Sequence, residues 1–416
     1  MTFLIRSTYN IIIVFLLFFT LFPVSFNFLP EFLSTRVIIA FFGAIQLIFN
    51  IALKPRMAIN KNIFKILLLS TIISIWSILC IGIFNHTADF TYVKHIYTIL
   101  IMILSTNFCV SFIEKKYSLT FNVLANFYFA TIFLQTIFVL LIFFIPPIRD
   151  FLVDMQRVGE RELLIVSSHM EDQNRFIGFG LMFYTASFFY GAALIFISYL
   201  LRENEGANKR VLFCLFLLFS LVGIGLSRST MIGLILSIVF YFVGSKINYS
   251  FIKRIFLFLI ACCSIVLGII MLFKLFPTLD DQFGALIKNS FEVFINLFTS
   301  SELKSDSAEG TFAMFYLPLQ EWTYFFGTGY YEQYTAIGDY RYSDIGYLRL
   351  LYYFGLLGVV LFFLFEIQIL NICFYKKGYK FIFWPLLFLL ILTNVKGLTT
   401  LAVIALLFIN IKPKLR

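Results

Sequence analysis

The stretch FFGTGYYEQYTAIGDYRYSDIGYLRLLYYFGLLG, residues 325–358, joins a long polar segment to an apolar run of membrane length. It combines two closely spaced glycines and a run of tyrosines with several charged residues, among them Asp339, Arg341, Asp344 and Arg349. Most of the chain upstream is apolar and is suited to act as a scaffold that holds this stretch at one face of a membrane. We therefore take residues 325–358 as the organising element of the sequence.

The composition excludes a soluble globular protein. Hydrophobic residues make up 61% of the 416 residues and charged residues only 13%, which is typical of a polytopic membrane protein. The net charge of +10 comes mainly from Lys and Arg in short loops between apolar runs. This placement is a topology signal and does not predict nucleic-acid binding. No metal-binding or nucleotide-binding motif occurs, so no metal and no cofactor are expected.

A membrane-spanning helix needs about 20 apolar residues. On this basis we predict an all-α fold in which residues 1–416 form one transmembrane domain of about twelve helices. The predicted spans cover residues 9–29, 36–53, 64–84, 96–113, 120–145, 179–201, 211–226, 230–244, 255–275, 346–371, 381–394 and 397–411. The last two are short, and we expect either a hairpin or one broken span.

The distribution of Lys and Arg predicts the orientation of these spans. Alternate short loops and the C-terminal tail carry most of the positive charge, including Lys115, Lys116, Lys377, Lys412 and Lys414, which places both termini in the cytoplasm. Two long polar segments, residues 146–178 and 276–345, then lie on the outer side. The second segment contains apolar residues at helical spacing between Phe283 and Phe298, which indicates short amphipathic helices at the membrane surface.

Three arginines are candidate ligands for an anion. Arg228 lies between two apolar runs on the predicted outer side, where a positive charge is unexpected as a topology signal. Arg175 is one of four arginines in the first outer segment, which contains no lysine; the alternative is a solvated loop with internal ion pairs. Arg349 follows Asp344 by five residues, near the start of a span. Asp344 is suited to cap that helix, whereas Arg349 requires Asp344 or an anionic ligand as its partner.

Other polar residues have simpler interpretations. Gly327 and Gly329 could let the backbone approach a phosphate, but a structural turn is the more common role of such a pair. His86, His95 and His169 are not spaced as a pair of metal ligands and are interpreted as ordinary loop residues. Glu366 is placed toward the cytoplasmic end of its span, where its side chain either pairs or extends to the surface.

Two short patches, residues 226–230 and 325–358, together with the predicted topology, resemble the Wzy-type O-antigen and capsular polysaccharide polymerases. The patches contain a Ser-Arg pair that opens a mid-chain span and an FG-x-G motif followed by D-x-GYLRLLYYFGLLG. This family shares a superfamily with the O-antigen ligases. The resemblance implies a glycosyltransferase that joins undecaprenyl-pyrophosphate-linked repeat units at the outer face of the bacterial cytoplasmic membrane, without a metal, in lipopolysaccharide or capsule synthesis.

The resemblance also implies roles for individual residues. Arg228 and Arg349 would hold the pyrophosphate with support from Arg341 and Arg175, and Asp344 would position or deprotonate the acceptor hydroxyl. The partners would be the lipid-linked oligosaccharide, the bilayer and, as a candidate protein partner, a chain-length regulator. Two departures stand out: Asp344 occupies a region where ligases usually carry a His, and residues 309–311 (Glu-Gly-Thr) lack the Arg that family members often place there.

Two other classes of function are open to the sequence. An O-antigen ligase, or another lipid-carrier-dependent glycosyltransferase, would use the same donor. A flippase for lipid-linked oligosaccharide would be expected to carry charges through a central cavity, whereas the charges here are concentrated on the predicted outer side.

Overall fold

The computed structural model describes residues 8–53, 61–157, 175–180, 184–203, 208–243, 284, 286, 290, 292, 321–331, 333–334, 340–341 and 345–414. Its helices are α2 (Thr8–Leu21), α3 (Thr35–Leu53), α4 (Lys61–Ile78) continued by η1 (Leu79–Phe84), α5 (His95–Glu114), α6 (Phe121–Phe144), α7 (Pro146–Met155), α9 (Tyr184–Glu203), α10 (Lys209–Leu226), α11 (Thr230–Phe242), α15 (Glu321–Phe326), α16 (Gly346–Leu370) continued by η2 (Asn371–Tyr375), α17 (Lys380–Thr393) and α18 (Ala402–Leu407). The short strands β1 (Gln333–Tyr334) and β2 (Tyr340–Arg341) pair antiparallel.

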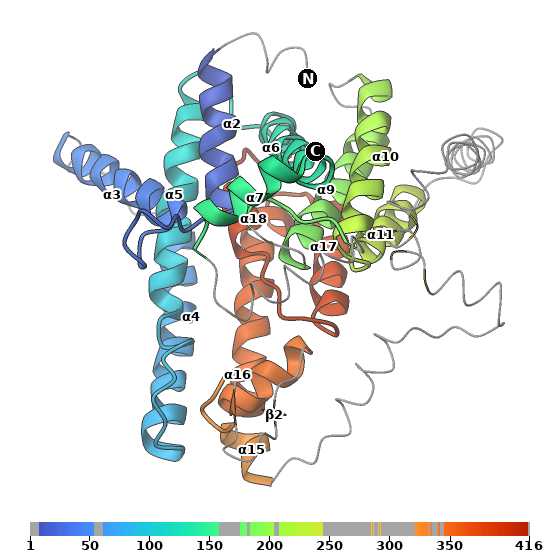
Figure 1. Ribbon diagram of the computed structural model, residues 1–416. Helices are drawn as coiled ribbons and strands as arrows, with labels where there is room; N and C mark the ends of the chain where they lie inside the picture. Colours follow the sequence, from blue (N-terminus) through green and yellow to red (C-terminus); the bar gives the residue numbers. More distant parts are fainter. Residues whose placement is uncertain are drawn as a thin grey trace.

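The described residues form a helical protein with seven helices that are long and apolar enough to cross a membrane (Figure 1). This confirms the prediction of an all-helical, polytopic architecture. Two of the twelve predicted spans are much shorter than expected: the helix within residues 9–29 ends at Leu21, and the helix within 397–411 has only six residues. Residues 255–275, another predicted span, lie outside the described residues.

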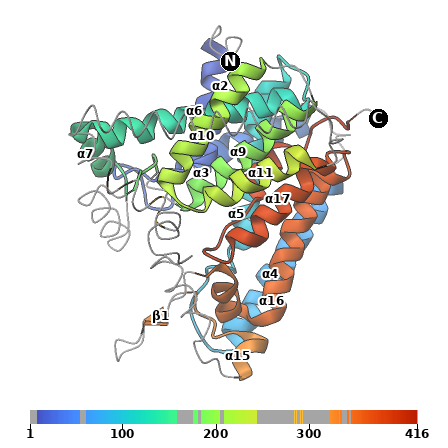
Figure 2. The same ribbon diagram turned by 90° about the vertical axis from the view of Figure 1, so that its right-hand side faces the viewer.

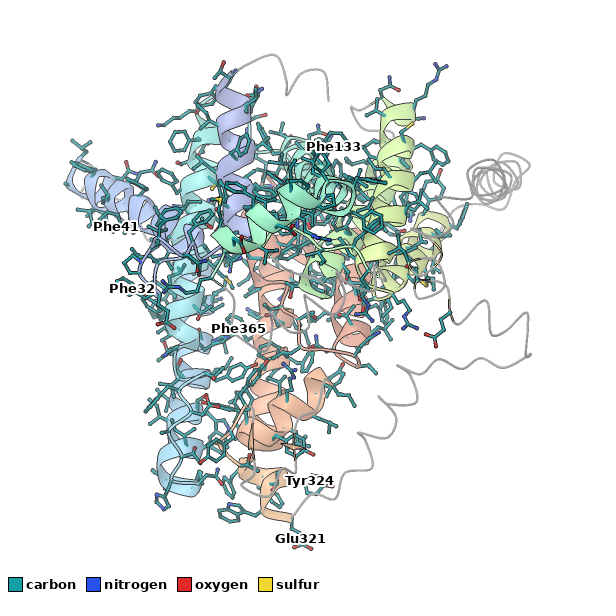
Figure 3. All side chains as sticks on the ribbon, in the orientation of Figure 1. Phe32, Phe41, Phe133, Glu321, Tyr324 and Phe365 are labelled. Atoms are coloured by element: carbon teal, nitrogen blue, oxygen red, sulfur yellow. The ribbon has the colours of Figure 1, made fainter. Side chains whose placement is uncertain are left out.

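The large apolar side chains separate into an interior set and a peripheral set. Phe365 is fully buried, whereas Phe41 on α3 is 63% exposed, and the two can be compared in Figure 3. Exposed phenylalanines and isoleucines continue along α3 and α4. A membrane-spanning helix is expected to present such side chains to lipid, because hydrocarbon tails are as apolar as they are.

Helix α16 is broken in its middle, and the chain reverses direction at the break (Figures 1 and 2). Phe354 and Gly355 have non-helical backbone angles, with φ +69° and ψ −174° at Gly355. The ring of Tyr347 stacks on that of Phe363 with centroids 5.1 Å apart. These residues are sixteen positions apart and would be separated by about 24 Å along a straight helix. The segment from Gly346 to Tyr353 is therefore a short limb folded back against the longer limb that follows.

The backbone carbonyls freed by this break accept hydrogen bonds from other segments. Thr328 donates to the Tyr352 carbonyl from its N–H (2.5 Å) and from its hydroxyl (3.0 Å). The indole N–H of Trp76 on α4 donates to the Phe354 carbonyl at 2.9 Å. Since an unsatisfied carbonyl in an apolar environment costs several kcal/mol, these donors stabilise the reversal.

Gly327 and Gly329 belong to the same arrangement. The Gly329 N–H donates to the Tyr353 carbonyl at 3.2 Å, and both glycines have φ of +71°. A Cβ atom on Gly327 would lie 2.5 Å from the Tyr353 carbonyl oxygen. The paired glycines thus let the backbone approach the broken helix. This is the structural role that the sequence analysis weighed against phosphate binding.

Helices α17 and α18 form the hairpin that the sequence allowed as one alternative. The two ends of the hairpin meet, since the Lys414 N–H donates to the Lys377 carbonyl at 2.8 Å. Its tip, residues 394–401, is partly buried and packs against the start of α16, where the Asn394 carbonyl accepts a hydrogen bond from the Tyr347 N–H at 3.4 Å. The folded-back limb of α16 and the α17–α18 hairpin therefore meet end to end.

Two loop contacts that the charge pattern assigns to opposite sides lie at different ends of the structure. At one end the tail bonds to the α5–α6 loop, through the Lys412 N–H and the Leu119 carbonyl at 3.0 Å. At the other end Thr87, between α4 and α5, donates to the Gly329 carbonyl at 2.9 Å. Figure 2 shows α15 far from both termini. The first outer segment begins with α7, whose end is bonded to residues 25–29.

Replacing Gly355 with alanine should destabilise the protein. A Cβ atom there would clash with the Phe325 carbonyl oxygen, and the backbone angles are restricted to glycine. We expect the free energy of unfolding in mixed micelles to fall by at least about 3 kcal/mol. The matched control is Gly82→Ala in η1, where an added Cβ meets nothing within 4 Å. An equal effect of both substitutions would contradict the strained reversal.

Candidate functional site

Arg228 lies in the turn between α10 and α11 and forms an ion pair with Glu292. Its Nη1 atom donates to Glu292 Oε2 at 2.5 Å, and the two side chains are 15% and 19% exposed. The turn is tight because Thr230 donates its hydroxyl to the Gly223 carbonyl at 2.7 Å. Glu292, from the second predicted outer segment, therefore contacts the α10–α11 turn through a partly desolvated charge pair, in which Coulomb attraction is stronger than in water.

Arg175 lies beside Arg228. The next residue, Phe176, donates its N–H to the Gly225 carbonyl at 3.0 Å, and its ring occupies the space above the Gly225 Cα atom. Burial lowers the pKa of the Arg175 guanidinium, and the positive charge of Arg228 lowers it further. The structure thus brings together two of the predicted arginines, one of which, Arg228, is paired with the carboxylate of Glu292.

Arg349 lies in a different polar cluster, on the folded-back limb of α16. Its Nη1 atom donates to the Tyr331 hydroxyl at 3.1 Å, and its guanidinium lies 5.3 Å from the Tyr331 ring centroid. The Tyr331 N–H in turn donates to Asp89 Oδ2 at 2.7 Å. Tyr331 is therefore a partner of Arg349 that the sequence analysis did not predict.

The remaining predicted site residues are only partly described. Arg341 lies in β2, and its backbone pairs with that of Gln333, whereas its side chain and the whole of Asp344 lie outside the described residues. Among the described contacts, Arg349 bonds to Tyr331, which bonds to Asp89, and Arg228 pairs with Glu292 and lies near Arg175. The clamp of Arg228 and Arg349 stays a prediction, because these contacts neither join nor separate the two guanidiniums.

The α4–α5 loop contributes residues that the sequence analysis missed. The Asp89 carbonyl accepts a hydrogen bond from the Tyr353 hydroxyl at 2.6 Å, and Tyr92 packs between Tyr353 and Tyr331. Burial raises the pKa of the Tyr92 hydroxyl well above its usual value, so this group is neutral at physiological pH. The carboxylate of Asp89, in a short predicted outer loop, was the one feature of the sequence that could have indicated this cluster.

Two further predictions need correction. His95 is not a loop residue: it begins α5, is buried, and its Nδ1 atom lies 2.8 Å from the Ser70 hydroxyl. Glu366 does not extend to the surface. It is fully buried and accepts hydrogen bonds from the Thr400 hydroxyl and, at 2.9 Å, from the Leu401 N–H. Its carboxyl group therefore caps the start of α18 at the end of the hairpin tip.

This arrangement defines what the candidate site can bind. No group of three or more His, Cys, Asp or Glu side chains suited to a metal occurs among the residues that the structure describes. The two guanidiniums of Arg175 and Arg228 offer forked donors of the kind that bind phosphate oxygens. Glu292 pairs with Arg228, so an anionic ligand that binds to this guanidinium has to compete with the carboxylate.

Comparisons of the chain with protein-family models, with curated proteins and with solved structures find no match. The resemblance to the Wzy-type polymerases therefore consists of the topology and the two motif patches alone.

The ion pair between Arg228 and Glu292 should show a measurable coupling energy. In a double-mutant cycle with Arg228→Gln and Glu292→Gln, we expect about 1–3 kcal/mol, because each single change leaves a partly buried charge without its described partner. Unfolding in mixed micelles measures it. The matched control is the pair of Arg149 and Asp150, in which Asp150 is 62% exposed; its coupling should stay below about 0.5 kcal/mol. Equal couplings in the two cycles would contradict the buried pair.

Proposed function

We propose that this protein is a glycosyltransferase of the bacterial cytoplasmic membrane that polymerises undecaprenyl-pyrophosphate-linked oligosaccharide repeat units. The observation that carries the proposal is the proximity of Arg175 to Arg228: the two arginines come from separate segments, the Phe176 N–H donates to the Gly225 carbonyl beside them, and Arg228 is ion-paired with Glu292. Bringing two like charges together is unfavourable unless an anion compensates them. A pyrophosphate carries more negative charge than one carboxylate and would compensate them more fully.

In this proposal the paired arginines act on the leaving group. The growing chain is transferred from undecaprenyl pyrophosphate to a hydroxyl of a new lipid-linked repeat unit. The bond between the anomeric carbon and the pyrophosphate oxygen breaks, a new glycosidic bond forms, and the acceptor hydroxyl loses its proton. Guanidinium groups stabilise the charge that develops on the departing pyrophosphate. Asp344 is proposed to accept or orient the acceptor proton.

Arg349 is proposed to bind the acceptor side. It lies on the folded-back limb of α16 and donates to the hydroxyl of Tyr331, whose N–H in turn donates to the Asp89 carboxylate. Tyrosine rings and hydroxyls are suited to contact sugars, because each offers an apolar face and a polar edge. Two polar clusters agree with a reaction that has a lipid-linked donor and a lipid-linked acceptor.

An O-antigen ligase is the second candidate, because it would use the same donor and the same pair of arginines. A flippase is a third: the fully buried Glu366 is the kind of intramembrane charge that transport would use. However, Glu366 accepts hydrogen bonds from Thr400 and Leu401, which gives it a structural role in the α17–α18 hairpin.

Substitution of the paired arginines should abolish polymer formation without loss of protein. In cells that depend on this gene, Arg228→Ala should leave single repeat units where the parent gives a ladder on electrophoresis, and Arg228→Lys should restore little, because lysine lacks the forked donors. Arg175→Ala should shorten or weaken the ladder. Arg349→Ala should also abolish it, through loss of the acceptor.

The matched control is Arg149→Ala. Arg149 belongs to the same predicted outer segment as Arg175, but it forms an exposed ion pair with Asp150. The substitution should leave the ladder unchanged. A normal ladder from Arg228→Ala at normal protein levels would contradict the proposal. Deletion of the gene separates the candidates: long polymer retained on its lipid carrier indicates a ligase, and loss of all outer-face material indicates a flippase.

A further inference from the structure

A basic hollow lies at the end of the structure opposite to α15, away from both polar clusters of the candidate site. It has a volume of roughly 390 Å³ and lies between the α5–α6 loop and the C-terminal tail. The residues that line it are Glu114, Lys115, Lys116, Tyr117, Ser118, Leu119, Asn410 and Lys412. Three lysines and one glutamate give this lining a net positive charge, and hydroxyl and amide groups supply further hydrogen-bonding atoms.

The walls of this hollow come from segments almost 300 residues apart in the sequence, and hydrogen bonds hold them together. The Lys412 N–H donates to the Leu119 carbonyl at 3.0 Å, and the Tyr117 hydroxyl donates to Asn10 Oδ1 at 3.0 Å. The hollow is thus part of the folded structure. A topology signal requires only that lysines lie on the correct side; it does not require that they converge on one concave surface.

Aromatic rings of two neighbouring helices position the lysine side chains of the loop. The Lys115 ammonium group lies 4.8 Å from the centroid of the Phe112 ring, and that of Lys116 lies 5.5 Å from the Tyr9 ring of α2. Cation–π contacts hold an ammonium group in a defined orientation. The Tyr9 hydroxyl also donates to the Phe112 carbonyl at 2.7 Å, which joins α2 to α5 at this position.

An exposed apolar surface continues from the hollow along α2. Ile12 and Phe15 follow Tyr9 at helical spacing and are 50% and 42% exposed. In a membrane protein such a surface contacts acyl chains. The basic hollow and the apolar stripe therefore match the two parts of one ligand, an anionic headgroup and its hydrocarbon tail.

We propose that this hollow binds the phosphate headgroup of an anionic phospholipid whose acyl chains lie along α2. Free phosphate offers the same headgroup chemistry but would make no use of the apolar stripe. This assignment does not depend on the proposed polymerase activity, because the site lies at the other end of the molecule and its test requires only the folded protein.

The test is native mass spectrometry of the full-length protein in nonionic detergent, with added phosphatidylglycerol or phosphatidylcholine. We expect the wild-type protein to retain phosphatidylglycerol and not phosphatidylcholine. The variant Lys115→Gln/Lys116→Gln/Lys412→Gln should bind phosphatidylglycerol at least about tenfold more weakly. The matched control, Lys209→Gln/Arg210→Gln/Lys380→Gln, removes the same charge from neighbouring helix ends outside the hollow and should bind as the wild type does.

Three results would overturn the proposal. One is equal retention of the two lipids by the wild-type protein, and another is an equal loss of binding in the two triple variants. The third concerns the source of the phosphate: inorganic phosphate that displaces phosphatidylglycerol and binds alone with equal affinity would show that the acyl chains contribute nothing. The wild-type lipid selectivity tests the proposal even if a triple variant does not fold.

Discussion

Backbone hydrogen bonding at the break in α16 is the constraint on which the rest of this structure depends. A helix that reverses inside an apolar environment exposes carbonyl groups that lipid cannot satisfy. Here the donors come from Thr328, Gly329 and Trp76, and Gly355 provides backbone angles that other residues avoid. Two distant segments of the chain therefore have to assemble around the break before α16 is stable in this conformation.

The reversal decides where the polar groups of this region lie. It places Arg349 on a short limb beside Tyr331 and brings the start of that limb against the tip of the α17–α18 hairpin. Glu366, on the longer limb, holds the end of the same tip through Leu401. Both limbs of α16 are thus connected to one turn, so that the position of the candidate acceptor site is coupled to the packing of the helices behind it.

The sequence was sufficient to predict the class of fold, because it contains apolar runs of membrane length that are separated by short loops with Lys and Arg. It could not predict the reversal of α16, since residues 346–371 form one continuous apolar run and hydropathy does not report direction. The sequence predicted that Arg175 and Arg228 could each bind an anion, but it could not predict that they lie close together. Their proximity depends on the packing of Phe176 against Gly225. Tyr331, Asp89 and Trp76 were missed for the same reason: each acts through a long-range contact.

The most direct test of the reversed α16 is cross-linking between Tyr347→Cys and Phe363→Cys with a short bifunctional thiol reagent, read out by peptide mass spectrometry. The two native rings lie 5.1 Å apart, so the structure predicts efficient cross-linking within one chain. The control pair, Ile96→Cys and Phe112→Cys, has the same sixteen-residue separation on the unbroken α5, about 24 Å along the axis, and should not react. Absence of a cross-link between positions 347 and 363, with both thiols accessible, would mean that α16 is straight and would contradict the account.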